Sequence, residues 1–301
     1  MKSDSVQIDK IKNYLLEVLK PLVDSKSIDW IQLQKQKIEE DSSYLKFYMA
    51  FGQASRYFKK NTLVLSDTQI QEAHDLLTGF SPASWDLLQA SRTYLLLHFT
   101  QKDAETYVSS LTRLFETADM HEQQALYAAL PLLPYQEALV DRAMEGLRTN
   151  IVSVFDAVAL NNPYPAKYFD DRAWNQMVIK AIFLQRPLYQ IQQADQRANQ
   201  QLADILVDYV HERWAAGREV VPELWRFVGP FLQPEHEVDI AKVIDTGDAL
   251  QIKAALLACS QSFLPFAQQL LRQNQNIASE ISSGILDWDA VGIAYLSSKS
   301  S

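Results

Sequence analysis

Apolar residues recur at three- and four-residue spacing along most of the N-terminal half of this 301-residue chain. That spacing places them on one face of an α-helix, whereas a strand needs strict alternation, and we find no alternating run. Only 8 glycines interrupt the sequence, which is rich in Leu, Ala and Gln, residues that favour helices. The pattern predicts helices over residues 8–23, 28–40, 43–59, 67–78, 83–99, 103–118, 122–133 and 135–148.

Helix-start signals agree with this periodicity. In a capping box, a Ser, Thr or Asp and the Glu or Gln three residues later each accept a hydrogen bond from the other's backbone N–H. The chain has this spacing at Ser66–Gln69, Asp119–Glu122 and Asp248–Gln251. Ser81 followed by Pro82 is a further start signal, because proline in the first turn loses no helical hydrogen bond. Short loops between such helices favour antiparallel neighbours.

Two helical segments resemble each other, which favours a repeat architecture. One begins at Asp119 and the other at Asp248, and each has an acidic cap, an Ala/Leu-rich helix and a second helix soon after. Helix pairs of this kind stack into solenoids, in which each pair covers the apolar face of its neighbour. We therefore expect an all-α fold, a HEAT-like α-solenoid array of antiparallel helix pairs.

The expected domain organisation follows from the breaks in the pattern. No Pro/Gly/Ser-rich linker divides the chain, and we expect the proline-containing stretch at residues 161–165 to be an ordered turn. We predict a single elongated helical-repeat domain over residues 1–296, with a motif-bearing core at residues 155–230. The end of the chain, residues 297–301, is expected to be a disordered tail.

Acidic residues outnumber basic ones, which gives the chain a formal net charge of −9. This charge repels nucleic-acid backbone and anionic lipid, so we expect neither as a general partner. No segment approaches the roughly 20 consecutive apolar residues that span a bilayer. The charged N-terminal residues predict an amphipathic helix and not a signal peptide. We expect no membrane insertion and a cytoplasmic location.

Several kinds of site are excluded because their residues are missing. The single cysteine, Cys259, excludes an intrachain disulfide and a multi-cysteine metal site, and its Ala/Leu surroundings predict a buried thiol. The sequence has no GxxxxGK(S/T) phosphate loop, no GxGxxG turn and no HExxH pair. Asp170 and Asp171 are similar to the magnesium motif of helical prenyl-chain enzymes, but the further acid one turn later is missing. We expect no metal and no cofactor.

Four polar residues share one face of the helix expected to begin near residue 199: Asp204, Asp208, His211 and Glu212. Asp208 and Glu212 are like charges four residues apart, which destabilise a helix unless a cation lies between them. A metal ion, Arg213 of a neighbouring chain, Arg218 or plain solvent would relieve this repulsion. We favour a solvated face.

One arginine falls where the same helix needs an apolar residue. Leu202, Ile205, Leu206 and Tyr209 form the expected core stripe, and Arg213 continues it. A guanidinium that leaves water is destabilising unless a carboxylate or another anion lies close to it. Two alternatives stay open: a structural ion pair between helices, or a cleft in which this arginine meets an anionic or polar ligand.

Tryptophans and polar residues gather between residues 161 and 226. Trp174, Trp214 and Trp225 lie there, half of the six tryptophans of the chain. Asp171 and Glu223 each flank a helix that carries a tryptophan, so we expect one of them to supply the carboxylate for the arginine. The flat face of a guanidinium also stacks well on an indole ring.

Asparagines in this region have alternative roles. Asn175 lies at the edge of an apolar stripe, where its amide needs partners that a cleft wall or a loop carbonyl would supply. Asn199 is predicted to cap the next helix, with Arg197 just before it. Asn162 lies in the proline turn, where with Tyr164 it either lines the rim of a pocket or ties down the turn.

The order of these short motifs resembles the EboA family of bacterial proteins. The resemblance is carried by Asn161-Asn162-Pro163-Tyr164-Pro165, Tyr168-Phe169-Asp170, Trp174-Asn175-Gln176-Met177, Lys180-Ala181, Arg197-Ala198-Asn199, Tyr209, His211-Glu212-Arg213-Trp214-Ala215-Ala216-Gly217-Arg218 and Pro222-Glu223-Leu224-Trp225-Arg226. It covers roughly residues 155–230, whereas the first 110 residues are similar only in helical character. Gln200 stands where the family pattern has proline, which leaves the preceding asparagine cap intact.

The resemblance implies a role in an operon that handles a secondary metabolite. Neighbouring genes of such operons encode a prenyltransferase-type membrane protein, a metal-dependent hydrolase, a dehydroquinate-synthase-like enzyme and a sugar-phosphate-isomerase-like enzyme. The set is associated with making a small molecule or moving it toward the periplasm. No reaction transfers to this chain from the family.

Three hypotheses follow for the function. The first is a non-enzymatic protein that binds a small-molecule metabolite or another protein of the same operon. The second is an enzyme acting on an aromatic or prenyl metabolite through His211, Lys180 or an acid from residues 170–212. The third is a structural adaptor. The candidate ligand- or partner-binding residues are Asn162, Tyr164, Asp171, Trp174, Asn175, Arg197, Tyr209, His211, Arg213, Trp214, Arg218, Glu223, Trp225 and Arg226.

Overall fold

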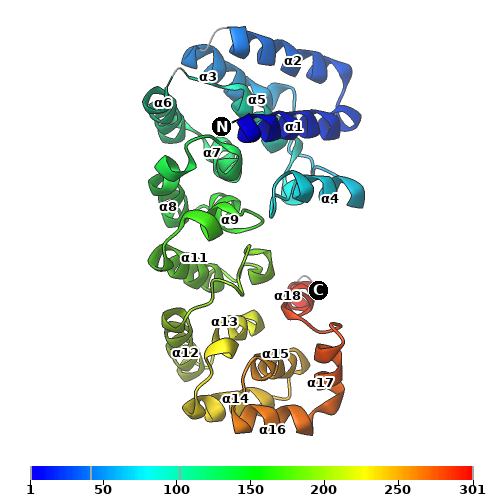
Figure 1. Cartoon of the computed structure of the whole chain (residues 1–301), viewed down its shortest axis with the longest axis vertical. Helices are drawn as coiled ribbons and strands as arrows, with labels where there is room; N and C mark the ends of the chain where they lie inside the picture. Colours follow the sequence, from blue (N-terminus) through cyan, green and yellow to red (C-terminus); the bar gives the residue numbers. More distant parts are fainter. Residues whose placement is uncertain (1, 41–42, 102, 300–301) are drawn as a thin grey trace. The chain divides into compact units, whose positions relative to one another are not determined.

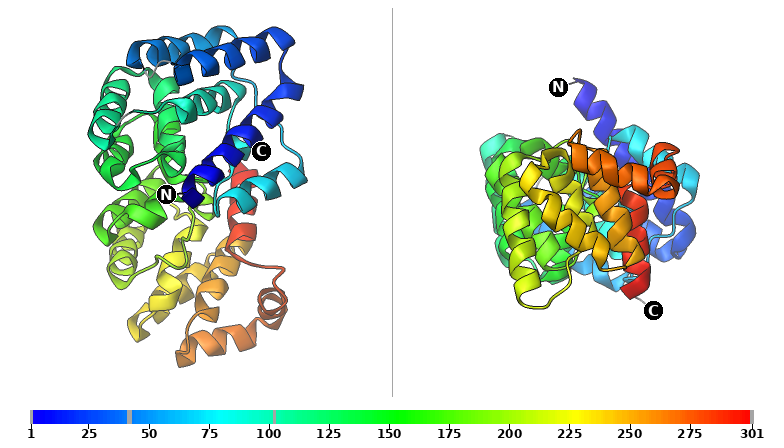
Figure 2. Two further views of the ribbon diagram at one scale, coloured as in Figure 1. Left: turned by 45° about the horizontal axis from the view of Figure 1, so that its top comes forward. Right: turned by 90° about the horizontal axis from the view of Figure 1, so that it is seen from below.

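A computed structural model describes residues 2–40, 43–101 and 103–299 of the chain. Within these residues the secondary structure consists of α-helices and short 3₁₀ helices, with no strand and one isolated antiparallel bridge between Thr62 and Asp86. In all the views of Figures 1 and 2, the ribbon consists of helices joined by loops. The expected all-α class is therefore confirmed.

The chain divides into two compact units, Met1–Phe169 and Asp170–Ser301. The first unit contains α1 (Lys2–Leu19), α2 (Ser25–Glu40), α3 (Tyr44–Gln53), α4 (Asp67–Leu76), α5 (Leu87–His98), α6 (Ala104–Thr117), α7 (Met120–Ala128), α8 (Val140–Arg148), α9 (Val152–Ala159) and α10 (Tyr164–Tyr168). Helix α5 is its centre, because all of its residues are buried and it contacts α1, α2, α3 and α7.

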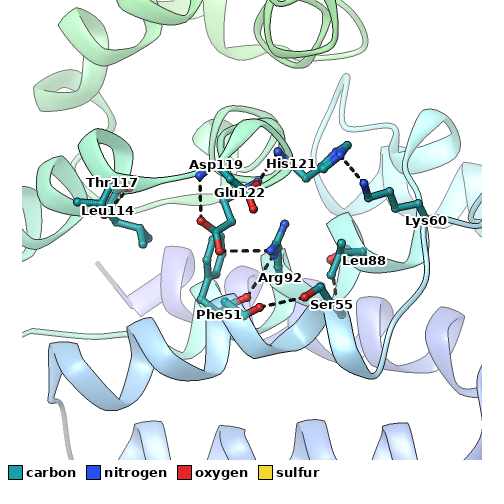
Figure 3. A network of polar contacts seen from close by, with 12 residues as sticks. Phe51, Ser55, Lys60, Leu88, Arg92, Leu114, Thr117, Asp119, His121 and Glu122 are labelled. Carbon is teal, nitrogen blue, oxygen red and sulfur yellow. Dashed lines mark hydrogen bonds and ion pairs between the residues drawn. The ribbon is translucent and has the colours of Figure 1, made fainter.

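A buried arginine links three helices of the first unit. Arg92 of α5 donates from Nε to the carbonyl of Phe51 in α3 (3.2 Å) and from Nη2 to Glu122 Oε1 in α7 (3.3 Å), as Figure 3 shows. Burial lowers the pKa of this guanidinium, and the nearby carboxylates, Glu122 first, oppose that shift. Charge pairing therefore offsets part of the desolvation cost in this core.

The second unit contains α11 (Asp171–Phe183), α12 (Gln200–Ala215), α13 (Trp225–Val228), α14 (Glu237–Asp245), α15 (Ala249–Ser260), α16 (Pro265–Gln273), α17 (Gln275–Ser282) and α18 (Trp288–Lys299). Helix α15 is central here, since it contacts α13, α14, α16, α17 and α18. Its Cys259 is fully buried, and burial raises the pKa of the thiol to about 12. The prediction of a buried thiol is confirmed.

The predicted helix starts are mostly correct. Both bonds of the capping box form at Ser66 of α4 and at Asp119 of α7. Asp248 also caps α15 through the N–H of Gln251, but the Gln251 amide donates to the Val220 carbonyl instead of completing the box. Pro82 opens only a 3₁₀ turn (η3, Pro82–Ser84), and α5 starts five residues later.

The boundary between the two units falls inside the expected motif-bearing core, at residues 169 and 170. The expectation of one elongated solenoid domain over residues 1–296 stays a prediction. At the end of the chain, Ser297, Ser298 and Lys299 belong to α18, so three of the five residues expected in a disordered tail are helical. Residues 300 and 301 lie outside the described residues.

Candidate functional site

The proline turn holds two of the candidate residues, both in the first unit. Asn162 is buried and donates from Nδ2 to the carbonyls of Tyr127 (3.2 Å) and Ala157 (2.8 Å), while its Oδ1 accepts from the N–H of Tyr164 (2.9 Å). The Tyr164 hydroxyl donates to the Gln136 carbonyl at 2.6 Å. All of these partners are backbone groups of the same unit. Of the two alternatives for this pair, the structure supports tying down the turn.

The other twelve candidate residues lie in the second unit, and Arg213 corrects an expectation there. Arg213 is half-buried and donates from Nε and Nη2 to the carbonyl of Glu219, at 3.0 and 2.8 Å. No ion pair with Asp171 or Glu223 forms, and the expected carboxylate partner was wrong. The arginine instead satisfies a carbonyl just beyond the C-terminus of its own helix, where a cation is favourable.

The burial of Arg213 was wrongly predicted because the buried face of α12 was placed on the wrong side of the helix. The buried residues of α12 are Leu202, Ala203, Leu206, Val207 and Val210. The stripe therefore runs through the alanine and valines and not through positions 205 and 209, which are exposed and half-buried. The predicted and the observed face share Leu202 and Leu206, and both continue with apolar residues, so the periodicity alone did not distinguish them.

The buried acid of this unit is Glu223, in the 3₁₀ helix η7 (Pro222–Leu224), and it is 1% exposed. Its Oε2 accepts from the backbone N–H of Leu188 at 3.2 Å. Burial raises the pKa of this carboxyl to about 7, although the backbone N–H groups of Leu188 and Tyr189 and the charge of Arg226 act in the opposite direction. The carboxyl therefore changes protonation state near neutral pH.

The buried arginine of this unit is Arg226, three residues further on in α13. Its Nε and Nη2 both bind the carboxylate of Asp195 (2.8 Å for Nη2), and Nη1 lies 3.4 Å from Asp289 of α18. The expected pairing of a buried guanidinium with a carboxylate thus occurs at Arg226. Because α13 is a single buried turn between two 3₁₀ helices, no periodicity distinguished this arginine in the sequence.

Helix α18 closes over the Glu223 carboxyl at Gly292. A Cβ atom at this position would lie 2.6 Å from both Cδ and Oε1 of Glu223, a distance that real Cβ contacts essentially never show. The Oε1 atom is fully buried and has no hydrogen-bond partner among the described residues. Only a glycine allows the helix backbone to approach this carboxyl so closely.

The three tryptophans occupy different environments. Trp174 and Trp225 are fully buried, and in the described part of the chain neither indole Nε1 has a hydrogen-bond partner. Trp214 is half-buried, with its ring centroid 6.5 Å from that of Trp225 and the Lys242 Nζ 4.3 Å above it. The guanidinium of Arg197 stacks 4.8 Å from the Trp174 ring. The arginine–indole stacking expected for Arg213 is found instead at Arg197.

The two asparagines of this unit bind each other. Asn175 is buried and donates to Asn199 Oδ1 (3.2 Å), and Asn199 Nδ2 donates back to Asn175 Oδ1 (2.8 Å). Asn199 Oδ1 also accepts from the N–H of Leu202, which confirms the predicted helix cap. Arg197 pairs with the exposed Asp171 at 3.2 Å. This group joins the start of α12 to α11.

The polar face of α12 is exposed, as predicted. Asp204, Asp208, His211 and Glu212 all lie at the surface. His211 Nε2 binds Asp239 of α14 at 2.8 Å, and Arg218 is exposed beyond the end of the helix. Among the described residues, no group of three or more His, Cys, Asp and Glu side chains is placed to hold a metal ion.

The candidate site is therefore smaller than the sequence predicted: Glu223 and Trp225, two residues apart in sequence, each have a buried polar atom without a hydrogen-bond partner among the described residues. A carboxyl with a pKa of about 7 donates or accepts a hydrogen bond at neutral pH, and an indole N–H donates one. The Glu223 carboxyl lies against Leu188, Tyr189 and Gly292, whereas the Trp225 ring lies against Trp214.

Sequence comparison places the chain in a family. The profile of one family, described as "Metabolite traffic protein EboA", matches residues 11–229. No curated protein and no solved structure matches the chain. The match begins near the N-terminus and thus extends far beyond the residues 155–230 on which the resemblance rested. Since it covers well over half of the chain, this protein belongs to the EboA family.

Proposed function

We propose that this protein serves metabolite traffic by binding a small molecule without changing it, at Glu223 and Trp225 of the second unit. One observation carries the proposal. Glu223 Oε1 and Trp225 Nε1 are both enclosed by protein and both lack a hydrogen-bond partner among the described residues. The family description, metabolite traffic protein, supplies the general role.

The energetic argument rests on those two atoms. A buried polar atom without a partner costs about 1–3 kcal/mol. Nine such side-chain atoms occur in the described residues, and these two lie only two residues apart in sequence. A ligand that accepts a hydrogen bond from the indole and exchanges one with the carboxyl recovers this cost. Asp195 and Asp289 already flank Arg226, which disfavours an anionic ligand. We therefore expect an uncharged aromatic molecule with hydroxyl or carbonyl groups.

Access to these atoms requires movement of α18. The helix contacts η6 (Leu188–Gln190), η7 and α15, and its Gly292 lies directly on the carboxyl of Glu223. Displacement of this one helix would expose the carboxyl while leaving α15 in contact with its other neighbours. The ligand would enter beneath α18, which acts as a cover in this proposal.

The structural-adaptor hypothesis fits these observations less well. It requires Arg213, Asn175 and Trp225 all to be satisfied within the protein. Arg213 and Asn175 are satisfied, by a carbonyl and by a reciprocal amide pair. Trp225 is not, because its Nε1 is buried without a partner in the described residues. The exception falls beside the buried acid, where binding would use it.

Catalysis is the second candidate function, and one observation favours it. A pKa of about 7 is the range in which a carboxyl works as a general acid or base, and Glu223 has that value. In that case the same site would transform an aromatic or prenyl metabolite. Binding leaves the mass of the metabolite unchanged, whereas catalysis changes it. The following experiment measures the mass of the bound molecule.

Native mass spectrometry of the protein purified from cells that express the whole operon tests the proposal. The wild type should carry a noncovalent adduct whose mass equals that of the unmodified metabolite that the operon supplies. Glu223→Gln should lose most of the adduct, and the matched variant Glu235→Gln, at an exposed acid of the same unit, should keep it. A folded wild type without adduct, or full retention in Glu223→Gln, would refute the proposal. An adduct of altered mass would indicate catalysis.

Other expectations about the role stay predictions. They are movement of the metabolite toward the periplasm, partners encoded in the same operon, a cytoplasmic location and a solenoid arrangement of helix pairs. Along the described residues, the structure has no helix that combines the length and apolar character needed to cross a membrane.

A further inference from the structure

One stretch of the first unit has a charge opposite to that of the whole protein. Residues 43–66 contain no acidic residue and four basic ones, Lys46, Arg56, Lys59 and Lys60. Their net charge is +4, so the remainder of the chain carries −9 − 4 = −13. The positive charge is thus concentrated in α3, the turn η2 (Ala54–Arg56) and the loop that follows.

The same stretch exposes large apolar side chains. Leu45, Tyr48 and Met49 of α3 are 64%, 38% and 51% exposed, and the spacing i, i+3, i+4 places them on one face of the helix. The opposite face, with Phe47 and Phe51, is fully buried against the unit. Helix α3 therefore presents apolar side chains on both faces. A helix at a protein surface needs them only on the face that packs against the core.

The residues after α3 expose further apolar side chains. Tyr57 and Val64 are also exposed, so five of the sixteen large exposed apolar residues in the described chain lie in this short stretch. Tyr57 is held in place by stacking on Trp30, with ring centroids 4.3 Å apart. Among the basic residues, Lys60 contacts His121 of α7 (Figure 3), whereas Arg56 and Lys59 are exposed.

The neighbouring helix α2 adds no net charge to this surface. Its three basic residues, Lys26, Lys35 and Lys37, are balanced by three acidic ones, Asp29, Glu39 and Glu40. The charge that a partner meets is therefore that of residues 43–66. A surface that combines tyrosine with Leu, Met, Lys and Arg is favoured at the boundary between lipid headgroups and acyl chains.

We propose that residues 43–66, with the Leu45–Tyr48–Met49 stripe at their centre, bind reversibly to an anionic membrane surface. The apolar stripe enters the headgroup region, and Arg56 and Lys59 interact with lipid phosphates. The protein as a whole is acidic, so this contact orients it with its one basic surface toward the bilayer. No helix inserts across the membrane. This surface belongs to the first unit and is independent of the site proposed at Glu223.

Vesicle flotation tests the proposal with the full-length protein. The probes are vesicles of phosphatidylglycerol and phosphatidylcholine (1:1) and vesicles of phosphatidylcholine alone. We expect binding to the anionic vesicles that falls about tenfold on pure phosphatidylcholine and falls again as salt is raised. The double variant Leu45→Asp/Met49→Asp should lose binding to both, and it should fold because both side chains are exposed.

Matched controls come from the second unit. Phe263 is 97% exposed, so Phe263→Asp removes an apolar side chain that is even more exposed than Leu45 or Met49, and it should leave flotation unchanged. Arg56→Glu/Lys59→Glu should reduce binding to anionic vesicles, and Arg272→Glu, at an exposed arginine of α16, should not. The proposal is overturned if the wild type stays unbound, or if Leu45→Asp/Met49→Asp floats as the wild type does. It is also overturned if the double variant still binds vesicles and loses, instead, an interaction with another protein.

Discussion

Glu223 couples the stability of the second unit to pH. Its pKa is about 7 in the folded protein and about 4.5 in the unfolded chain. The folded state therefore holds this proton more tightly, and the stabilisation is fully present below about pH 4.5 and is lost as pH rises through 7. From pH 4.5 to 8, this group alone should lower the free energy of unfolding by up to about 3 kcal/mol.

Chemical unfolding of the wild type and Glu223→Gln across this pH range measures the effect. Because glutamine does not ionise, the difference between the two free energies should change by about 3 kcal/mol in favour of the variant as pH rises. Glu235→Gln is the control, since that acid is exposed. A difference that stays constant with pH would contradict a buried, protonated carboxyl.

The two arginines, Arg213 and Arg226, give a second prediction at the residue scale. Arg226→Ala breaks a bidentate pair in a buried environment and should cost about 2–3 kcal/mol of stability. Arg213→Ala loses bonds to one carbonyl at a half-exposed position and should cost about 1 kcal/mol or less. Urea unfolding of both variants ranks them, and the reverse order would show that the buried charge had been misidentified.

Helix α18 depends on the glycine that meets Glu223. In Gly292→Ala, the added methyl would gain roughly 0.5–1 kcal/mol of helix propensity. The clash with Glu223 and Tyr189 should cost about 1–3 kcal/mol, and this term should dominate. We expect lower stability and faster hydrogen exchange in α18, compared with Ile293→Ala at an exposed position of the same helix. Unchanged exchange in α18 would mean that the helix does not lie on the carboxyl.

The elements that the sequence predicts well are those with one buried face. Helices α1 to α8 overlap their expected ranges, with ends that differ by up to six residues, and the caps at Ser66, Asp119 and Asn199 form as expected. Helix α5 was expected as a helix, but its burial on all sides, Arg92 included, was not, because the helices that cover it are distant in sequence. The one-turn helix α13 has no period at all, so Arg226 and its acidic partners emerged only in three dimensions.

At the scale of the whole molecule, candidate residues that are close in sequence separate into two units. Asn162 and Tyr164 stabilise a turn in the first unit, whereas Glu223 and Trp225 lie in the second. Side-chain types alone predicted one continuous locus, because a sequence does not show which carbonyls already satisfy an asparagine or a tyrosine. The EboA family match spans parts of both units, so the motif order reflects both a folded turn and the candidate site.

Hydrogen–deuterium exchange with and without the small molecule retained in native mass spectrometry tests the central claim most directly. Binding at Glu223 and Trp225 beneath α18 should slow exchange in residues 186–190, 222–228 and 288–294, and Glu223→Gln should abolish this protection. Protection confined to the first unit, or no change in a sample that carries the metabolite, would contradict the proposed site.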